Sequence, residues 1–208
     1  MDVDRGALYE SARQRFAALV GAGVDPDAAV PATPAWTVHD VVAHLAGIAR
    51  DAMTGNMEGA PGEAWTAAQV ARGAGVPIAD LVAQWAIDAQ GVAAFLSSPD
   101  GESVSAAVSD VHSHEADLRH ALGLPVAVPA PFLSWCAEAL RDGFADAVRE
   151  AGLAANTPAI DDVEWFRGRL GRRTEAEVRA YPWPVDATPY LESFVVFGPA
   201  THSLAEHH

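Results

Sequence analysis

Two stretches of the chain carry histidines at positions that a helix would turn inward. In Trp36–Leu45, His44 lies among apolar residues, and in Asp110–Leu118, Asp110 and His114 are four residues apart. Side chains at that spacing share one face of a helix. Two imidazoles and one carboxylate suit Zn²⁺, Ni²⁺ or Fe²⁺, and three protein ligands leave a coordination position open. The sequence therefore predicts a divalent-metal site at His44, Asp110 and His114, with zinc as the first choice.

Each of these histidines also has a simpler interpretation as a hydrogen-bonded core residue, and the Asp110–His114 pair can serve stability alone. A metal-ligating histidine usually donates its second ring nitrogen to a nearby acceptor. Asp40 and Asp117 lie within helical reach of that role. His112 and Glu115 fall on other sides of their helix, where we expect them to be solvated.

Apolar residues recur at helical spacing along most of the chain, which predicts a mainly α-helical fold. Thr37 and Asp40 have the spacing of a capping box at a helix start. After Gly152 the pattern weakens, and residues 189–197 fit either helix or strand. We expect an antiparallel four-helix bundle with a short C-terminal cap. The expected helices are 4–21, one from Thr37 onward, 78–96, 107–122 and 132–148, with shorter pieces at 64–71, 163–170 and 174–180.

Composition limits the setting and the partners of the protein. A chain of 208 residues, half of them hydrophobic, can bury one good core with a small appended unit. No apolar run approaches the about 18 residues that span a bilayer, and no secretory signal opens the chain. The single cysteine, Cys136, excludes an internal disulfide and is interpreted as structural, so we expect a cytoplasmic protein. The net charge of −15 argues against nucleic acid or a membrane surface as partner.

Two blocks resemble a known family. The block Thr33-Pro-Ala-Trp-Thr-Val-His-Asp-Val-Val-Ala-His44-Leu-Ala-Gly47 and the block Asp110-Val-His-Ser-His114-Glu-Ala-Asp117-Leu118 resemble the mycothiol-dependent maleylpyruvate isomerase-like proteins. These are a branch of the DinB-like metal-binding four-helix bundles. The resemblance implies that His44, Asp110 and His114 are the ligands, with Asp110 in place of the more common and longer glutamate.

The same resemblance implies thiol chemistry. A bound divalent metal lowers the pKa of a thiol, here mycothiol as cofactor or co-substrate, and the thiolate adds to a small-molecule electrophile. The implied activity is that of an isomerase or an S-transferase. The alternative is a non-catalytic metal- or ligand-binding bundle that acts as a sensor or an interaction module, and a bundle that has lost its metal site also stays open.

The arginine-rich run from Gly168 to Arg179, together with Trp183-Pro-Val-Asp186, resembles the short C-terminal segment of the family. Arg172 and Arg173 are candidates for binding the thiol cofactor, because arginine binds carboxylates through two parallel hydrogen bonds. Alternatively, these arginines neutralise nearby acids of the bundle surface. We expect a bundle domain over residues 1–125 and a C-terminal helix and cap over 126–204. Residues 205–208 resemble the remnant of a purification tag.

Overall fold

The computed structural model describes residues 3–206, and the predicted tag residues His207 and His208 lie outside this range. The chain divides into two compact units, one ending at Pro125 and one beginning at Val126. Between residues 3 and 206 the structure is helical and contains no strand, only the isolated bridges Ala29–Thr37 and Thr174–Ala200. The prediction of a mainly α-helical protein is therefore confirmed.

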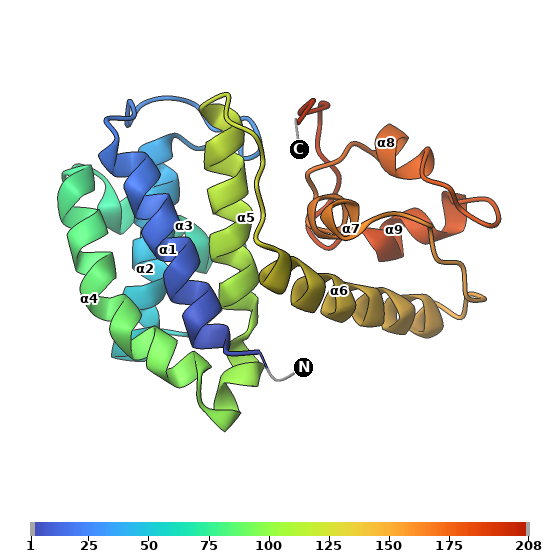
Figure 1. The fold of residues 1–208 in the computed structure, drawn as a ribbon, viewed down its shortest axis with the longest axis horizontal. Helices are drawn as coiled ribbons and strands as arrows, with labels where there is room; N and C mark the ends of the chain where they lie inside the picture. Colours follow the sequence, from blue (N-terminus) through green and yellow to red (C-terminus); the bar gives the residue numbers. More distant parts are fainter. Residues whose placement is uncertain (1–2, 207–208) are drawn as a thin grey trace. The chain divides into compact units, whose positions relative to one another are not determined.

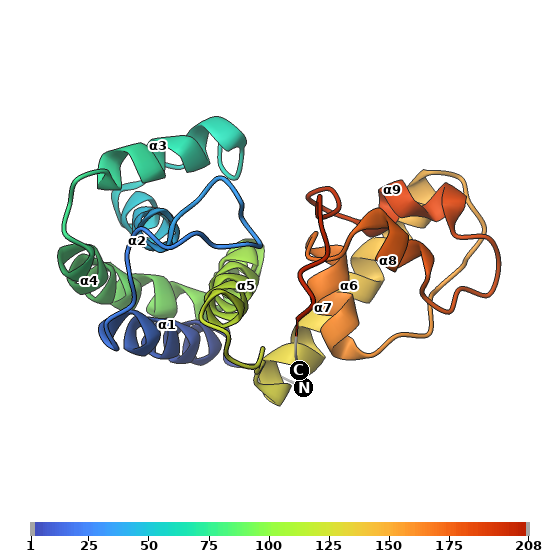
Figure 2. The same cartoon turned by 90° about the horizontal axis from the view of Figure 1, so that it is seen from above.

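The first unit is a set of packed helices. Helix α1 contacts α4 and α5, while α2 contacts α3 and α4 and also reaches α5. Figure 1 shows α1 running between α4 and α5, and Figure 2 shows α3 on the side of α2 that faces away from α1. The elements are α1 (Arg5–Gly21), α2 (Val38–Thr54), α3 (Glu63–Gly73), α4 (Ile78–Leu96), the 3-10 helix η1 (Pro99–Val104) and α5 (Ala106–Ala121).

Helix α2 begins at the predicted capping box. The Thr37 hydroxyl accepts the backbone N–H of Asp40 at 3.2 Å, and the Asp40 carboxylate accepts the backbone N–H of Thr37 at 2.9 Å. A buried apolar stripe that includes Val41 and Leu45 then fixes the rotation of the helix. Each such side chain contributes about 1.5–3 kcal/mol when buried. His44 lies within this stripe and is turned inward with it, at 5% exposure.

Two glycines let α2 and α3 approach closely. A Cβ atom added at Gly47 would lie 2.6 Å from the Cβ atom of Gln69, and one added at Gly73 would lie 2.4 Å from the Cβ atom of Ala43. Real Cβ atoms do not approach so closely, so a larger side chain at either position would force the helices apart. The close approach brings Gln69 of α3 against α2.

Polar pairs connect α1 to its neighbours. Arg15 donates to both carboxylate oxygens of Glu115 on α5, at 2.8 and 2.7 Å. The indole N–H of Trp85 on α4 donates to the Tyr9 hydroxyl at 2.9 Å. Burial raises the pKa of Tyr9 to about 12, and the negative charge of Asp110 adds to this shift. Tyr9 is therefore a neutral phenol at pH 7.

The second unit has its own aromatic core. Phe144, Trp165 and Phe194 pack edge to face or tilted, with ring centroids 5.4–5.7 Å apart. Residues 189–197, which fitted helix or strand, fold in their first part as helix. The elements are α6 (Ala130–Glu150), α7 (Asp162–Arg169), α8 (Glu175–Arg179), the 3-10 helix η2 (Thr188–Tyr190) and α9 (Leu191–Phe194).

None of the helices in the described part of the chain has the length and apolar character that crossing a membrane requires.

Candidate metal site

The three side chains predicted as metal ligands converge in the first unit. His44 comes from α2, and Asp110 and His114 come from α5. Each of the three residues has one ligand atom that lies within 4.8 Å of the ligand atoms of the other two. Among residues 3–206, no other set of three histidine, cysteine or acidic residues converges so closely. The two histidines are buried, and the Asp110 side chain is 33% exposed.

The distances fit a shared cation. The Nε2 atom of His44 lies 3.5 Å from Asp110 Oδ2, and the Nε2 atom of His114 lies 3.5 Å from Asp110 Oδ1. Two ligand atoms of one tetrahedral zinc ion, each about 2.0–2.2 Å from the metal, lie about 3.3–3.6 Å apart. The observed spacing is longer than a good hydrogen bond and close to this edge length. The donor set of two imidazoles and one carboxylate also suits zinc.

A buried hydrogen-bond chain sets the tautomer of His44. The carboxylate of Asp51 accepts the side-chain amide N–H of Gln69 at 3.0 Å, which turns the Gln69 carbonyl oxygen toward His44. This oxygen lies 2.8 Å from His44 Nδ1. Because the oxygen can only accept, the Nδ1 atom must carry the proton. The lone pair of His44 is therefore on Nε2, the atom that faces Asp110.

Asp51 is itself held as an anion. Burial alone would raise its pKa, but hydrogen bonds from Asn56, Gln69 and Arg72 outweigh burial and hold the pKa below the usual range. Arg72 lies 2.7 Å from both carboxylate oxygens, and Asn56 donates at 2.8 Å. The charged end of the chain is thus fixed before any ligand binds.

The second histidine has an acid behind it. Asp117 Oδ2 lies 3.3 Å from His114 Nδ1, and the Asp117 side chain is fully buried. Asp117 is thus the acid nearest to this ring nitrogen, but the two atoms form no hydrogen bond in the structure, so support of His114 by Asp117 stays a prediction. Asp40 serves the helix cap instead. Sequence reasoning missed Gln69. A single glutamine in an alanine-rich helix carries no signal that distinguishes it from a solvated residue.

Trp36 covers the two imidazoles from the loop that precedes α2. Its ring centroid lies 5.0 Å from that of His44 and 5.9 Å from that of His114. The two imidazoles themselves lie 5.4 Å apart, edge to face. The loop is held by backbone hydrogen bonds such as Val30 N–H to Trp36 O at 3.1 Å. Trp36 therefore forms an apolar wall beside the three converging side chains.

Two further expectations for α5 are wrong. His112 and Glu115 were expected to be solvated, yet each is only 2% exposed, and every residue from Val111 to Leu118 is buried. Apolar periodicity marks one buried face, but polar residues can be buried on other faces when they are paired. Glu115 pairs with Arg15, and the His112 ring lies 2.9 Å from the Val108 carbonyl. Burial lowers the pKa of His112 to about 4, so it is neutral at pH 7.

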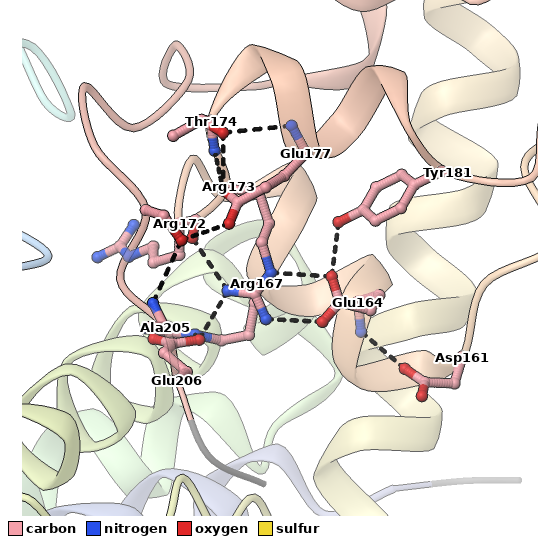
Figure 3. Close-up of polar contacts among 11 residues, drawn as sticks. Asp161, Glu164, Arg167, Arg172, Arg173, Thr174, Glu177, Tyr181, Ala205 and Glu206 are labelled. Atoms are coloured by element: carbon pink, nitrogen blue, oxygen red, sulfur yellow. Dashed lines mark hydrogen bonds and ion pairs between the residues drawn. The ribbon is translucent and has the colours of Figure 1, made fainter.

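Arg172 and Arg173, the candidates for cofactor binding, lie in the second unit. Arg172 donates to the Leu170 carbonyl at 2.6 Å, and Arg173 donates to the carboxylates of Glu164 and Glu206. Arg173 thus pairs with acids (Figure 3), but both of these acids belong to the second unit and not to the bundle. Binding of a thiol cofactor by Arg172 and Arg173 stays a prediction.

The chain was also compared with known proteins. Residues 9–122, more than half of the 208 residues, match a family model described as the mycothiol maleylpyruvate isomerase N-terminal domain. All three converging side chains lie within this range. No curated protein and no solved structure matches the chain.

Proposed function

The chain belongs to the mycothiol maleylpyruvate isomerase N-terminal domain family, and from this premise we propose that it is a divalent-metal-dependent enzyme that uses a thiol. The thiol is mycothiol, and the reaction is an isomerisation or an S-transfer on a small electrophile. We also propose that α1, α2, α4 and α5 form the four-helix arrangement of the DinB-like bundles. The observation that carries the proposal is the convergence of His44, Asp110 and His114.

The ligands in this proposal are His44, Asp110 and His114, and Zn²⁺ is the first choice over Ni²⁺ and Fe²⁺. Bound there, a divalent cation would lower the pKa of a thiol and so increase the thiolate fraction at neutral pH. The protein's part is to present two imidazoles and one carboxylate in a fixed geometry. Gln69 orients the His44 ring from behind through a hydrogen bond, which is the usual arrangement around metal-ligating histidines, and Asp117 lies 3.3 Å behind the His114 ring.

An external thiol suits this chain better than a nucleophile of its own. Cys136 is buried, and it lies in the second unit. In the proposed reaction the thiolate sulfur forms a C–S bond with a conjugated electrophile, while the π electron pair of the C=C bond moves onto the electron-withdrawing group. An S-transferase keeps the C–S bond, and a proton from solvent adds to the neighbouring carbon. An isomerase instead allows rotation about the new C–C single bond, after which the double bond re-forms and the thiolate leaves.

The partners proposed here are small molecules, and the site of action is the cytoplasm. A net charge of −15 disfavours nucleic acid and anionic membranes, because both attract basic surfaces.

Metal analysis tests the site. Protein purified without chelators and without an affinity tag should contain about one zinc, nickel or iron ion per chain. His44→Ala and His114→Ala should each remove this metal, while His120→Ala on the same helix as His114 should keep it. Full metal content in the His44→Ala/His114→Ala double variant would refute the assignment.

Turnover separates an enzyme from a binding module. The metal-loaded protein should consume mycothiol in the presence of a reactive electrophile, or isomerise a conjugated electrophile without net thiol consumption. If the protein retains metal tightly and transforms no member of a broad electrophile panel, the non-catalytic alternative is favoured.

A further inference from the structure

Trp36 lies where the candidate metal site meets solvent. His44 and His114 are each 5% exposed, whereas the Trp36 side chain is half-buried and the Asp110 side chain is 33% exposed. The Trp36 ring centroid lies 5.0 and 5.9 Å from the centroids of the two imidazoles. Of the four side chains that meet here, Trp36 and Asp110 therefore offer the surface that an approaching small molecule contacts first.

The indole N–H of Trp36 is a hydrogen-bond donor beside the site. The indole N–H groups of Trp65, Trp85 and Trp183 each donate to an oxygen atom at 2.8–2.9 Å. Among residues 3–206, no group accepts a hydrogen bond from the Trp36 indole. The N–H of an enclosed indole usually has a partner. This donor is therefore available to a molecule that binds next to the imidazoles.

The loop that carries Trp36 is fixed by its own backbone. The backbone N–H of Trp36 donates to the Thr33 carbonyl at 2.8 Å, and the Val30 N–H donates to the Trp36 carbonyl at 3.1 Å. The capping box at Thr37 follows directly and begins α2. Because none of these contacts involves the indole, its position is set before a ligand arrives, which reduces the entropy that binding costs.

An indole in this position can recognise two features of a small molecule at once. Its aromatic surface packs well against a flat π system. Its N–H donates to an oxygen atom that lies in the same plane as that π system. A carbonyl compound with a conjugated C=C bond has both features. When a thiolate adds to such a compound, the carbonyl oxygen gains negative charge, so a hydrogen bond to this oxygen is stronger in the transition state than in the bound substrate.

We propose that Trp36 is a substrate-binding residue that selects conjugated carbonyl compounds. The indole packs against the flat part of the electrophile, and the indole N–H donates to its carbonyl oxygen. This assignment rests on the proposed function, because it assumes that an electrophile binds at the metal site. As the C–S bond forms, the π electron pair moves onto the carbonyl oxygen, and the indole stabilises this charge while it keeps its proton. A proton from solvent then adds to the neighbouring carbon, or the thiolate leaves again.

Binding of an unreactive probe tests the assignment without turnover. Sorbamide, a flat conjugated amide, is titrated into the full chain without thiol, and hexanamide is its saturated counterpart. In nitrogen–proton NMR spectra, the indole signal of Trp36 is identified by its absence in Trp36→Phe. Sorbamide should shift this signal in a saturable manner, and hexanamide should bind about 2–12-fold more weakly. The indole signals of Trp65 and Trp183 should not move, because these groups already donate to backbone carbonyls.

Two variants separate the ring from its N–H group. Trp36→Phe keeps an aromatic ring, so kcat for a conjugated carbonyl electrophile should fall about 100-fold with little change in KM. Trp36→Leu also loses the ring, so KM should rise about 2–12-fold as well. Both variants should keep the metal content of the parent, because Trp36 supplies no ligand atom. Trp65→Phe is the matched control: its indole donates to Asn56, which follows the C-terminal end of α2, whereas Trp36 precedes the N-terminal end.

The proposal is overturned if the Trp36 signal does not respond to sorbamide, or if Trp36→Leu binds sorbamide as tightly as the parent does. The titration is made with and without Zn²⁺, so it remains decisive if the chain binds no zinc. If sorbamide binds at Trp36 but no electrophile is turned over, the binding role stands and the proposed reaction fails. If a Trp36 variant does not fold, the comparison of sorbamide with hexanamide in the parent decides.

Discussion

Replacement of Gln69 by leucine tests whether the hydrogen-bond chain behind His44 prepares the metal site. Gln69 is 1% exposed, so water cannot easily replace the lost carbonyl oxygen, and the Nδ1–H group of His44 would remain buried without an acceptor. Such a loss costs about 1–3 kcal/mol. Mutation of a residue that hydrogen-bonds a metal-ligating side chain usually weakens metal affinity about 10–100-fold. We therefore expect the dissociation constant for Zn²⁺ to rise about 10–100-fold, or about 1.4–2.7 kcal/mol.

The measurement is a competition titration of metal-free protein with a chelating zinc indicator. Gln84→Leu is the matched control, because Gln84 also donates to a buried aspartate, Asp88, but lies on α4, which carries none of the three ligands. Its zinc affinity should remain within about twofold of the parent. Circular dichroism establishes that both variants are folded.

A second readout does not depend on metal affinity. Nitrogen NMR of the metal-free parent, recorded at a pH high enough to deprotonate an imidazolium ring, should show the ring proton of His44 on Nδ1, and Gln69→Leu should lose this strict preference. If Gln69→Leu binds zinc as tightly as the parent, or if the parent carries the proton on Nε2, the reasoning fails.

Three further predictions concern stability. Gly47→Ala should lower the free energy of unfolding in urea by about 1–3 kcal/mol, because the new Cβ atom would collide with Gln69, whereas Gly21→Ala has open space and should be near neutral. The pKa of Asp51 in the folded protein lies below its ordinary value of 3.8, so the unfolded chain binds more protons in acid. The free energy of unfolding should therefore fall as the pH drops below 3.8. Asp51→Asn should flatten this pH dependence, as measured by urea titrations between pH 5 and 2.5. Zn²⁺ at 100 times its dissociation constant should raise the free energy of unfolding by about 2.7 kcal/mol in the parent and not in His44→Ala, as measured by urea unfolding.

Local patterns were sufficient for the helices of the first unit. The capping box at Thr37 and Asp40 is a contact between residues three apart, so it is visible in the sequence and was predicted correctly. Asp110 and His114 share a face for the same reason, since one helical turn separates them. The burial of His112 was not predictable in this way, because the apolar period describes one face of α5 and does not show how many neighbours surround it.

The sequence by itself determined the helices of the first unit, the inward position of His44 and the family of the chain. Only the tertiary structure decided that α2 and α5 bring His44 to Asp110 and His114, and that α3 places Gln69 behind His44. The physical reason is that helix formation depends on neighbours within one or two turns, whereas these polar contacts depend on how separate helices pack, which has no period in the sequence.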